Sequence, residues 1–220
     1  MEHIVLLGDS IFDNAPYVSA GSEVLSQLRS RLGPRHQVSL LARDGDVLAD
    51  VARQVARLGY LDTPATWLLV SCGGNDVLGL LNEMGRPVPT VLAATELLAS
   101  WQADFQRDYR RMLDTVLAHG KPTAVATIYD SVPGLAPGLR TALAVFNDVI
   151  VREATLRRMP VLDLRVVCSD PADYAPVSPI EPSAQGGARI AAAIAELVGT
   201  HHPAAPNAVL YGAATGFPKK

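Results

Sequence analysis

Short apolar runs alternate with amphipathic segments along most of this chain, and this alternation most strongly limits its possible folds. Apolar runs occupy residues 3–7, 37–41, 66–71, 123–128 and 160–164. Between and after them, apolar residues recur every three or four positions, which predicts helices over 22–32, 47–58, 91–118, 139–157 and 184–198. Strands that are apolar at nearly every position are buried on both faces, as in a parallel sheet. The pattern therefore predicts an α/β fold with helices on both sides of a parallel sheet.

The size and charge of the chain indicate one domain and exclude some partner classes. Its 220 residues, 49% of them hydrophobic, suffice for a single large core. Net charge is −3 with no strongly basic stretch, so we expect neither nucleic acid nor an anionic membrane as a partner. No run approaches the ~20 apolar residues of a membrane span. We expect one domain over residues 1–199 and an Ala-, Pro- and Gly-rich C-terminal extension over residues 200–220.

The cysteines indicate a reducing compartment. Cys72 lies inside an apolar run and far in sequence from Cys168, which favours two free thiols over a disulfide. No histidine stands near either of them, so no zinc site is expected. The first residues lack the positive start and long apolar stretch of a secretory signal. These observations predict a cytoplasmic protein without a bound metal.

Four polar or glycine-containing segments fall where a parallel sheet binds its ligands, beyond the carboxyl ends of the strands. They are Gly8-Asp9-Ser10, Gly45, Gly73-Gly74-Asn75-Asp76 and Glu181. Each also has an ordinary structural reading as a turn, a helix cap or an Asx turn. Asp9 is expected to tie the serine loop to nearby N–H groups, and Asp76 to cap a neighbouring segment. Together and in this order, the segments indicate a serine nucleophile with hydrogen-bond donors for an oxyanion.

This set of residues resembles the SGNH hydrolases, also called the GDSL esterase and lipase family, as far as about Val198. The resemblance implies that Ser10 is the nucleophile. It implies an oxyanion hole made by the Ser10 backbone N–H, Gly45 and Asn75. It further implies a flavodoxin-like three-layer sandwich with five parallel strands, and hydrolysis of esters or thioesters without metal or cofactor.

The last motif departs from the family pattern, which has Asp-x-x-His followed by Pro-Ser and then Gly. Pro182-Ser183 and Gly186 are present, but Ser178 stands in place of the aspartate and Glu181 in place of the histidine. None of the five histidines stands where it would replace the missing one.

Glu181 has two readings. A free glutamate has a pKa of about 4.3 against about 6.5 for histidine, so it is the weaker base unless burial raises its pKa. In a dry pocket it could accept the Ser10 proton, and a carboxylate needs no aspartate to fix a tautomer. Alternatively, Glu181 is a carboxylate at the positive end of the last helix, which would lower its pKa.

The sequence therefore predicts an acylhydrolase for a small ester, thioester or acyl group, with Ser10 as nucleophile and Glu181 as an atypical base. Residues 78–92 and 129–138 are expected to wall an apolar acyl or alkyl pocket. Two alternatives stay open: a binding protein that has lost hydrolysis, and an acyltransferase on the same site. The sequence indicates neither the substrate nor the oligomeric state.

Overall fold

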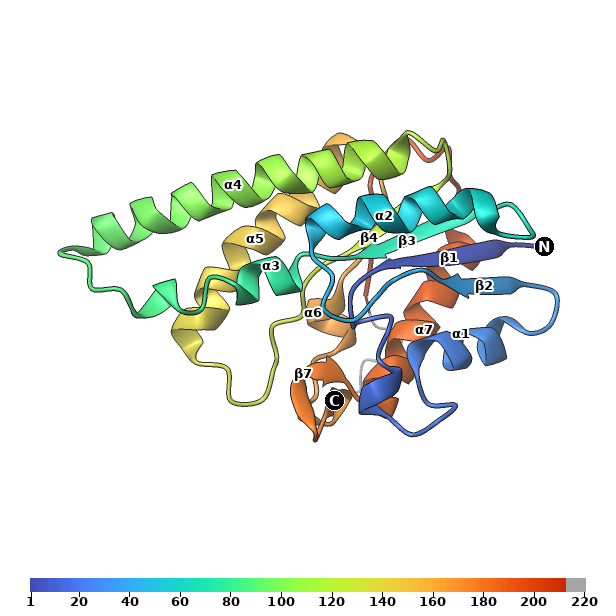
Figure 1. The fold of residues 1–220 in the computed structure, drawn as a ribbon, viewed down its shortest axis with the longest axis horizontal. Coiled ribbons are helices and arrows are strands. Elements are labelled where there is room, and N and C mark those ends of the chain that lie inside the picture. Colours follow the sequence, from blue (N-terminus) through green and yellow to red (C-terminus); the bar gives the residue numbers. More distant parts are fainter. Residues whose placement is uncertain (213–220) are drawn as a thin grey trace, which may run out of the picture.

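The computed structural model describes residues 1–212. Its main sheet has strand order β2-β1-β3-β4-β5-β8, and every neighbouring pair is parallel. The strands are β1 (His3–Gly8), β2 (Gln37–Leu40), β3 (Trp67–Ser71), β4 (Thr123–Ala126), β5 (Val161–Leu162) and β8 (Leu210–Tyr211). Figure 1 shows helices on both sides of this sheet. The predicted α/β sandwich is therefore confirmed.

The helices divide between the two faces of the sheet because successive residues of a buried strand point in opposite directions. Ile4 and Leu6 of β1 pack into one apolar cluster with the side chains of α1 (Val24–Leu32) and α7 (Ala184–Thr200). Val5 and Leu7 pack into a second cluster. Its helices are α2 (Val51–Val55), α4 (Val91–Leu117) and α5 (Pro137–Leu156).

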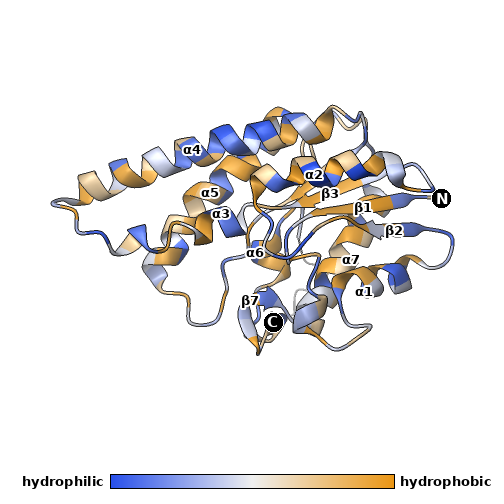
Figure 2. Cartoon of the chain, viewed as in Figure 1, coloured by the Kyte–Doolittle hydropathy of each residue, from blue (hydrophilic) through white to orange (hydrophobic). Residues whose placement is uncertain are grey.

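The hydropathy pattern follows this layering. In Figure 2 the central strands are mostly hydrophobic, whereas α4 carries hydrophilic and hydrophobic residues side by side. The first part of α4 extends beyond the sheet together with α3 (Gly74–Leu78), as Figure 1 shows. No helix within residues 1–212 is both long enough and apolar enough to span a bilayer.

The expected five strands become six, because part of the C-terminal segment joins the sheet. Leu210–Tyr211 forms β8 alongside β5, and the N–H groups of Val161 and Asp163 donate to Val209 and Tyr211 carbonyls, both at 2.8 Å. The segment had no periodicity because a two-residue edge strand is too short to show one. The domain division at residue 199 stays a prediction. The part of the expected C-terminal extension over residues 213–220 lies outside the described residues.

Several short elements were also missed or shortened. The strand expected over 160–164 spans only Val161–Leu162, because the Asp163 side chain accepts from the Arg165 N–H and starts α6 (Leu164–Val167). The helix expected over 47–58 is a short α2 between two 3-10 turns, Leu48–Asp50 and Ala56–Tyr60. Other 3-10 turns cover Ala15–Tyr17, Glu83–Gly85 and Pro171–Asp173. A small antiparallel hairpin, β6 (Tyr174–Ala175) and β7 (Ser178–Pro182), precedes α7.

Candidate functional site: an acid-lined apolar cavity at the strand ends

Ser10 lies in a tight turn directly after β1. Gly8 has φ of +120°, and a Cβ there would lie 1.7 Å from the Ser71 carbonyl oxygen, so only glycine fits. The N–H groups of Phe12 and Asp13 both donate to the Asp9 carbonyl at 3.2 and 3.1 Å and close the turn. Ser10 is buried and lines a cavity. Its own backbone N–H has no hydrogen-bond partner within residues 1–212, so it is free to donate to a ligand.

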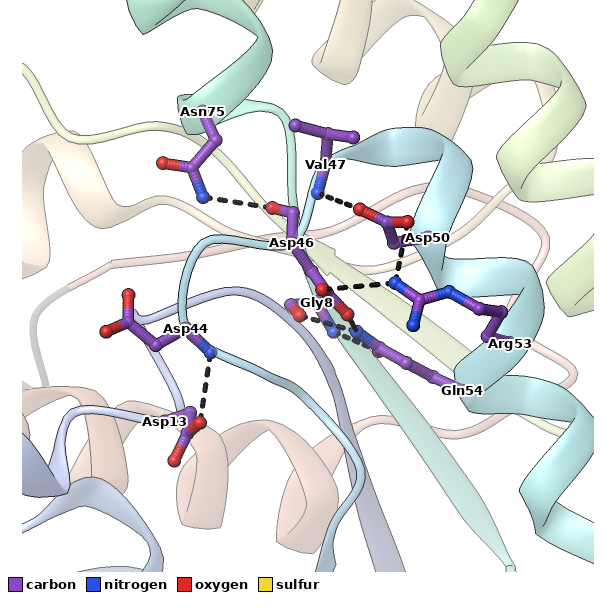
Figure 3. Close-up of polar contacts among 9 residues, drawn as sticks. All are labelled: Gly8, Asp13, Asp44, Asp46, Val47, Asp50, Arg53, Gln54 and Asn75. Carbon is purple, nitrogen blue, oxygen red and sulfur yellow. Dashed lines mark hydrogen bonds and ion pairs between the residues drawn. The ribbon is translucent and has the colours of Figure 1, made fainter.

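Asn75 lies at the start of α3, after Gly73. Gly73 has φ of +116° and a Cβ there would approach the Phe105 ring to 2.9 Å, so this bend also requires glycine. The Asn75 Nδ2 donates one hydrogen to the Asp46 carbonyl oxygen at 2.9 Å (Figure 3). Asn75 also lines the cavity that contains Ser10. An amide nitrogen carries two hydrogens, so the second remains for a ligand.

Gly45 occupies an exposed turn after β2, with φ of +82°. Its backbone N–H has no partner in the part of the chain that the structure describes, but Gly45 is not part of the cavity wall. The structure thus brings Ser10 and Asn75 together at the cavity and leaves Gly45 outside its lining.

Glu181 lies in β7, and two side-chain hydrogen bonds hold this strand beside the cavity. The Tyr129 hydroxyl donates to the carbonyl of Ile180, and the Asn14 amide donates to that of Pro182 at 3.2 Å. Glu181 is only 5% exposed and lines the cavity with Ser10. Its Oε2 is buried and has no hydrogen-bond partner in residues 1–212, where no Arg or Lys forms an ion pair with it either.

The electrostatic environment of Glu181 favours a neutral carboxyl. Burial raises its pKa to about 7. The Ser10 hydroxyl, as a hydrogen-bond donor, opposes this rise, and the charge of Asp44 adds to it. The alternative reading as a helix-terminal carboxylate required a lowered pKa, which is the opposite direction. Helix α7 is capped instead by Ser183, whose Oγ accepts from Gln185 and Gly186 N–H groups at 3.1 Å, as expected for a serine there.

Asp9 has a role in the electrostatics that the sequence did not indicate. Its Oδ1 accepts from the Ile11 N–H at 3.2 Å, which is the expected loop-tying contact. Asp9 is also buried in the cavity wall, and burial raises its pKa to about 8 despite that bond, with the charge of Glu181 adding to the shift. Asp76 accepts from the Leu48 N–H at 3.1 Å and so ties α3 to the turn before α2.

The cavity has a volume of about 140 Å³ and extends from Ser10 between α3, α4 and α5. Both expected wall segments contribute to it, and so do aromatic residues of the long helices. Its apolar lining includes Leu78, Leu81, Met84, Trp101, Leu135, Leu139 and Phe146. Asp9 and Glu181 are the carboxylic acids of the lining, to which no Arg, Lys or His of residues 1–212 contributes.

Other candidates lie away from the cavity. Ser178 starts β7, pairs with Ala175 and is not among the described residues that line the cavity. None of the five histidines, all of which lie within the described residues, lines the cavity; His3 bonds to Thr63 and Ser39, and His201 packs on Trp67. Within residues 1–212, no group of three or more His, Cys, Asp or Glu side chains is placed to hold a metal ion.

A parallel α/β sandwich with a buried serine and two carboxyl groups on the wall of one apolar cavity fits an ester hydrolase. The chain belongs to the GDSL-like lipase/acylhydrolase family, whose sequence model matches residues 6–189. No curated protein matches it in sequence.

Solved structures of low sequence identity share the fold. A lipolytic G-D-S-L family protein from Veillonella parvula is 13% identical, with a TM-score of 0.68, over 91% of this chain and 100% of its own. An inhibitor-bound aryl esterase from M. smegmatis is 14% identical, with a TM-score of 0.67, over 91% and 99%. A variant acetyl xylan esterase from Geobacillus stearothermophilus is 15% identical, with a TM-score of 0.63, over 91% and 96%.

Proposed function

We propose that this protein hydrolyses small esters with an apolar acyl group, using Ser10 as the nucleophile and Glu181 as the general base. The observation that carries the proposal is the buried, unpartnered Oε2 of Glu181 beside Ser10, in a carboxyl whose pKa is about 7. A base works best when its pKa lies near the working pH. Burial thus gives this carboxylate a basicity close to that of histidine.

In the proposed reaction, the Ser10 Oγ attacks the ester carbonyl carbon as its proton passes to the Glu181 carboxylate. The tetrahedral intermediate collapses, the C–O bond to the alcohol breaks, and Glu181 returns the proton to the departing alkoxide. A water molecule then attacks the acyl-enzyme, with Glu181 taking its proton and returning it to Ser10. The acid is released and both side chains regain their starting states.

The negative charge on the carbonyl oxygen requires donors fixed in advance. The unpartnered N–H of Ser10 and the second Nδ2 hydrogen of Asn75 supply two of them. The Gly45 N–H is the third donor of the proposal, although Gly45 stands outside the cavity lining. Because Asp9 is a neutral acid below about pH 8, it adds no negative charge against the oxyanion at neutral pH.

The lining of the cavity favours an uncharged, apolar acyl group as the bound part of the substrate. Its wall is mainly Leu, Met, Trp and Phe, and its ionisable acids, Asp9 and Glu181, would repel an anionic chain. Neighbouring structures described as an aryl esterase and an acetyl xylan esterase support esters of small acyl groups as the class to try. The free, buried Cys72 and Cys168 support a cytoplasmic location.

The test compares the wild type with Ser10→Ala and Glu181→Gln on p-nitrophenyl acetate, butyrate and hexanoate between pH 5 and 9. We expect Ser10→Ala to abolish hydrolysis, and Glu181→Gln to lower kcat by about 10²-fold or more, the usual contribution of a general base. A wild type as inactive as Ser10→Ala would refute hydrolysis and favour the binding-protein alternative. Product analysis with added alcohols distinguishes hydrolysis from acyl transfer.

A further inference from the structure

Gln54 is a fully buried amide on α2 whose hydrogen-bonding groups all have partners. It is 3% exposed, on the face of α2 that packs against the sheet. Its Oε1 accepts from the Gly8 N–H at 2.7 Å, and its Nε2 donates to the Gly8 carbonyl at 2.7 Å and to Asp46 Oδ2 at 2.8 Å (Figure 3). One acceptor and both donor hydrogens of the amide are therefore used.

The bond from the Gly8 N–H to Gln54 replaces one that β2 would otherwise make. Strand β2 ends at Leu40, and the next two N–H groups, of Leu41 and Ala42, both donate to the Leu6 carbonyl at 2.9 Å. No backbone group of β2 is then left to accept from the Gly8 N–H. The Gly8 carbonyl still accepts from the Arg43 N–H at 3.0 Å, so the missing group is an acceptor for the Gly8 N–H. Gln54 Oε1 supplies that acceptor, and Gln54 Nε2 adds a second donor to the Gly8 carbonyl, two residues before Ser10.

The bond to Asp46 connects the same amide to the oxyanion side of the site. The Asp46 carboxylate receives Gln54 Nε2, and its backbone carbonyl receives Asn75 Nδ2 at 2.9 Å. One chain of hydrogen bonds thus runs from Gly8 through Gln54 and Asp46 to Asn75. It joins the segment that carries the candidate nucleophile to the side chain that faces the same cavity from α3.

We propose that Gln54 is a positioning residue that fixes Ser10 and Asn75 relative to each other, acting through Gly8 and Asp46. This inference rests on the proposed ester hydrolysis. Attack and oxyanion binding need the two groups held to within ~0.5 Å, and buried supporting hydrogen bonds provide such restraint. Gln54 touches neither substrate nor reacting atoms, so its effect passes entirely through the residues that it holds.

Glutamine suits this place better than its near isosteres. Methionine has the same length but neither donor nor acceptor of comparable strength. An ionised glutamate would lose both donors and bring a second negative charge against Asp46. A protonated glutamate has one O–H and one carbonyl oxygen, enough to restore the pair of bonds to Gly8.

The test uses Gln54→Met and Gln54→Glu. The control is Gln27→Met, because Gln27 on α1 also donates to two carbonyls, those of Ser22 and Ala184, away from the site. Hydrolysis of p-nitrophenyl butyrate is measured well below the lowest melting temperature. We expect Gln54→Met to lower kcat by about 10- to 100-fold with KM changed less than about twofold, and Gln27→Met to retain kcat within about twofold.

Rescue by pH separates positioning from general damage to the fold. The ratio of Gln54→Glu to wild-type kcat should rise as pH falls from 8 to 6, because protonation of the introduced carboxyl restores the bonds to Gly8. A folded Gln54→Met with wild-type kcat, or a ratio for Gln54→Glu that does not change with pH, overturns the inference.

A second readout needs no turnover, so failure of the proposed function can be distinguished from failure of this inference. NMR follows exchange of the Gly8 amide proton and the side-chain amide signals of Asn75. Gln54→Met should speed Gly8 exchange about tenfold or more and shift the Asn75 signals, whereas Gln27→Met should do neither. Unchanged Gly8 and Asn75 signals in Gln54→Met overturn the positioning role even if the wild type does not hydrolyse esters.

Discussion

Asp9 and Glu181 place two carboxyl groups on the wall of one buried cavity. Burial raises the pKa of both, to about 8 for Asp9 and about 7 for Glu181, and the charge of Glu181 adds to the shift of Asp9. The pair therefore carries one negative charge over a window near pH 7 to 8, as expected for coupled acids. The proposed mechanism needs this state, with Glu181 ionised and Asp9 neutral.

The first prediction concerns the acid limb of the pH profile. Glu181 must be deprotonated to accept the Ser10 proton in the proposed mechanism, so kcat/KM should rise as pH increases through the pKa of about 7. Initial rates on p-nitrophenyl butyrate in buffers of constant ionic strength measure this. In Glu181→Gln the residual rate should lose this limb, and a limb of unchanged position would show that another group titrates.

The alkaline limb tests Asp9. Ionisation of Asp9 near pH 8 adds a negative charge close to the developing oxyanion, so kcat should fall above that pH. Asp9→Asn keeps an oxygen that accepts from the Ile11 N–H. It should retain activity within about threefold at pH 7 and remove the alkaline decline. Asp62→Asn, at an exposed position, is the control. An alkaline decline that survives in Asp9→Asn contradicts the assignment.

A third prediction concerns stability. Because the folded-state pKa of Glu181 is raised above its unfolded value, the folded protein holds the proton more tightly, and stability falls as pH rises from about 4.5 to about 7. Glu181→Gln should therefore raise the free energy of unfolding at pH 8 by about 1–3 kcal/mol, with little effect at pH 4.5. Urea denaturation at both pH values measures this.

Glu153 provides the opposite case for the same experiment. It is buried, with its carboxylate 2.8 Å from Arg110 and 2.6 Å from Arg157, and its pKa is lowered by hydrogen bonds that outweigh burial. Its contribution is present above its unfolded pKa and is lost as pH falls. Glu153→Gln should accordingly destabilise the protein at pH 8. Equal signs for the two variants would contradict the assigned environments.

The fourth prediction tests the acyl cavity. Ala142 lies on α5 in the cavity wall, so Ala142→Phe should fill part of the space. We expect kcat/KM for p-nitrophenyl hexanoate to fall about tenfold or more relative to acetate, as expected when one side of a pocket is blocked. Ala144→Phe, at an exposed position on the same helix, should leave the ratio unchanged. A similar loss for both esters would place the acyl chain elsewhere.

The layered fold was predictable because each buried strand is a continuous apolar run and most of the following helices show a helical hydrophobic period. The location of Ser10 and Asn75 at one cavity was predictable for a related reason: residues just after parallel strands meet at one edge of the sheet. The two-residue strand β8 and the β6–β7 hairpin carry no such period, so their pairing depends on contacts distant in sequence.

The electrostatics of the site were less accessible from sequence. The raised pKa of Glu181 depends on its burial and on the absence of an ion pair to it within residues 1–212, which only the folded chain defines. The sequence contains one indication that Gln54 is buried: it is a polar residue between Val51 and Val55 on the apolar stripe of the second predicted helix. That signal indicates a buried amide without identifying Gly8 and Asp46 as its partners.

The pairing of β8 with β5 has a practical consequence for anyone trimming this chain. Deletion of the residues after 199 would remove strand β8 and leave the N–H groups of Val161 and Asp163 without their acceptors. It would also take away His201, whose ring packs edge-on against Trp67, and Tyr211, whose ring packs edge-on against His201. An unpaired sheet edge promotes aggregation. Truncated versions of the protein should therefore end no earlier than residue 212.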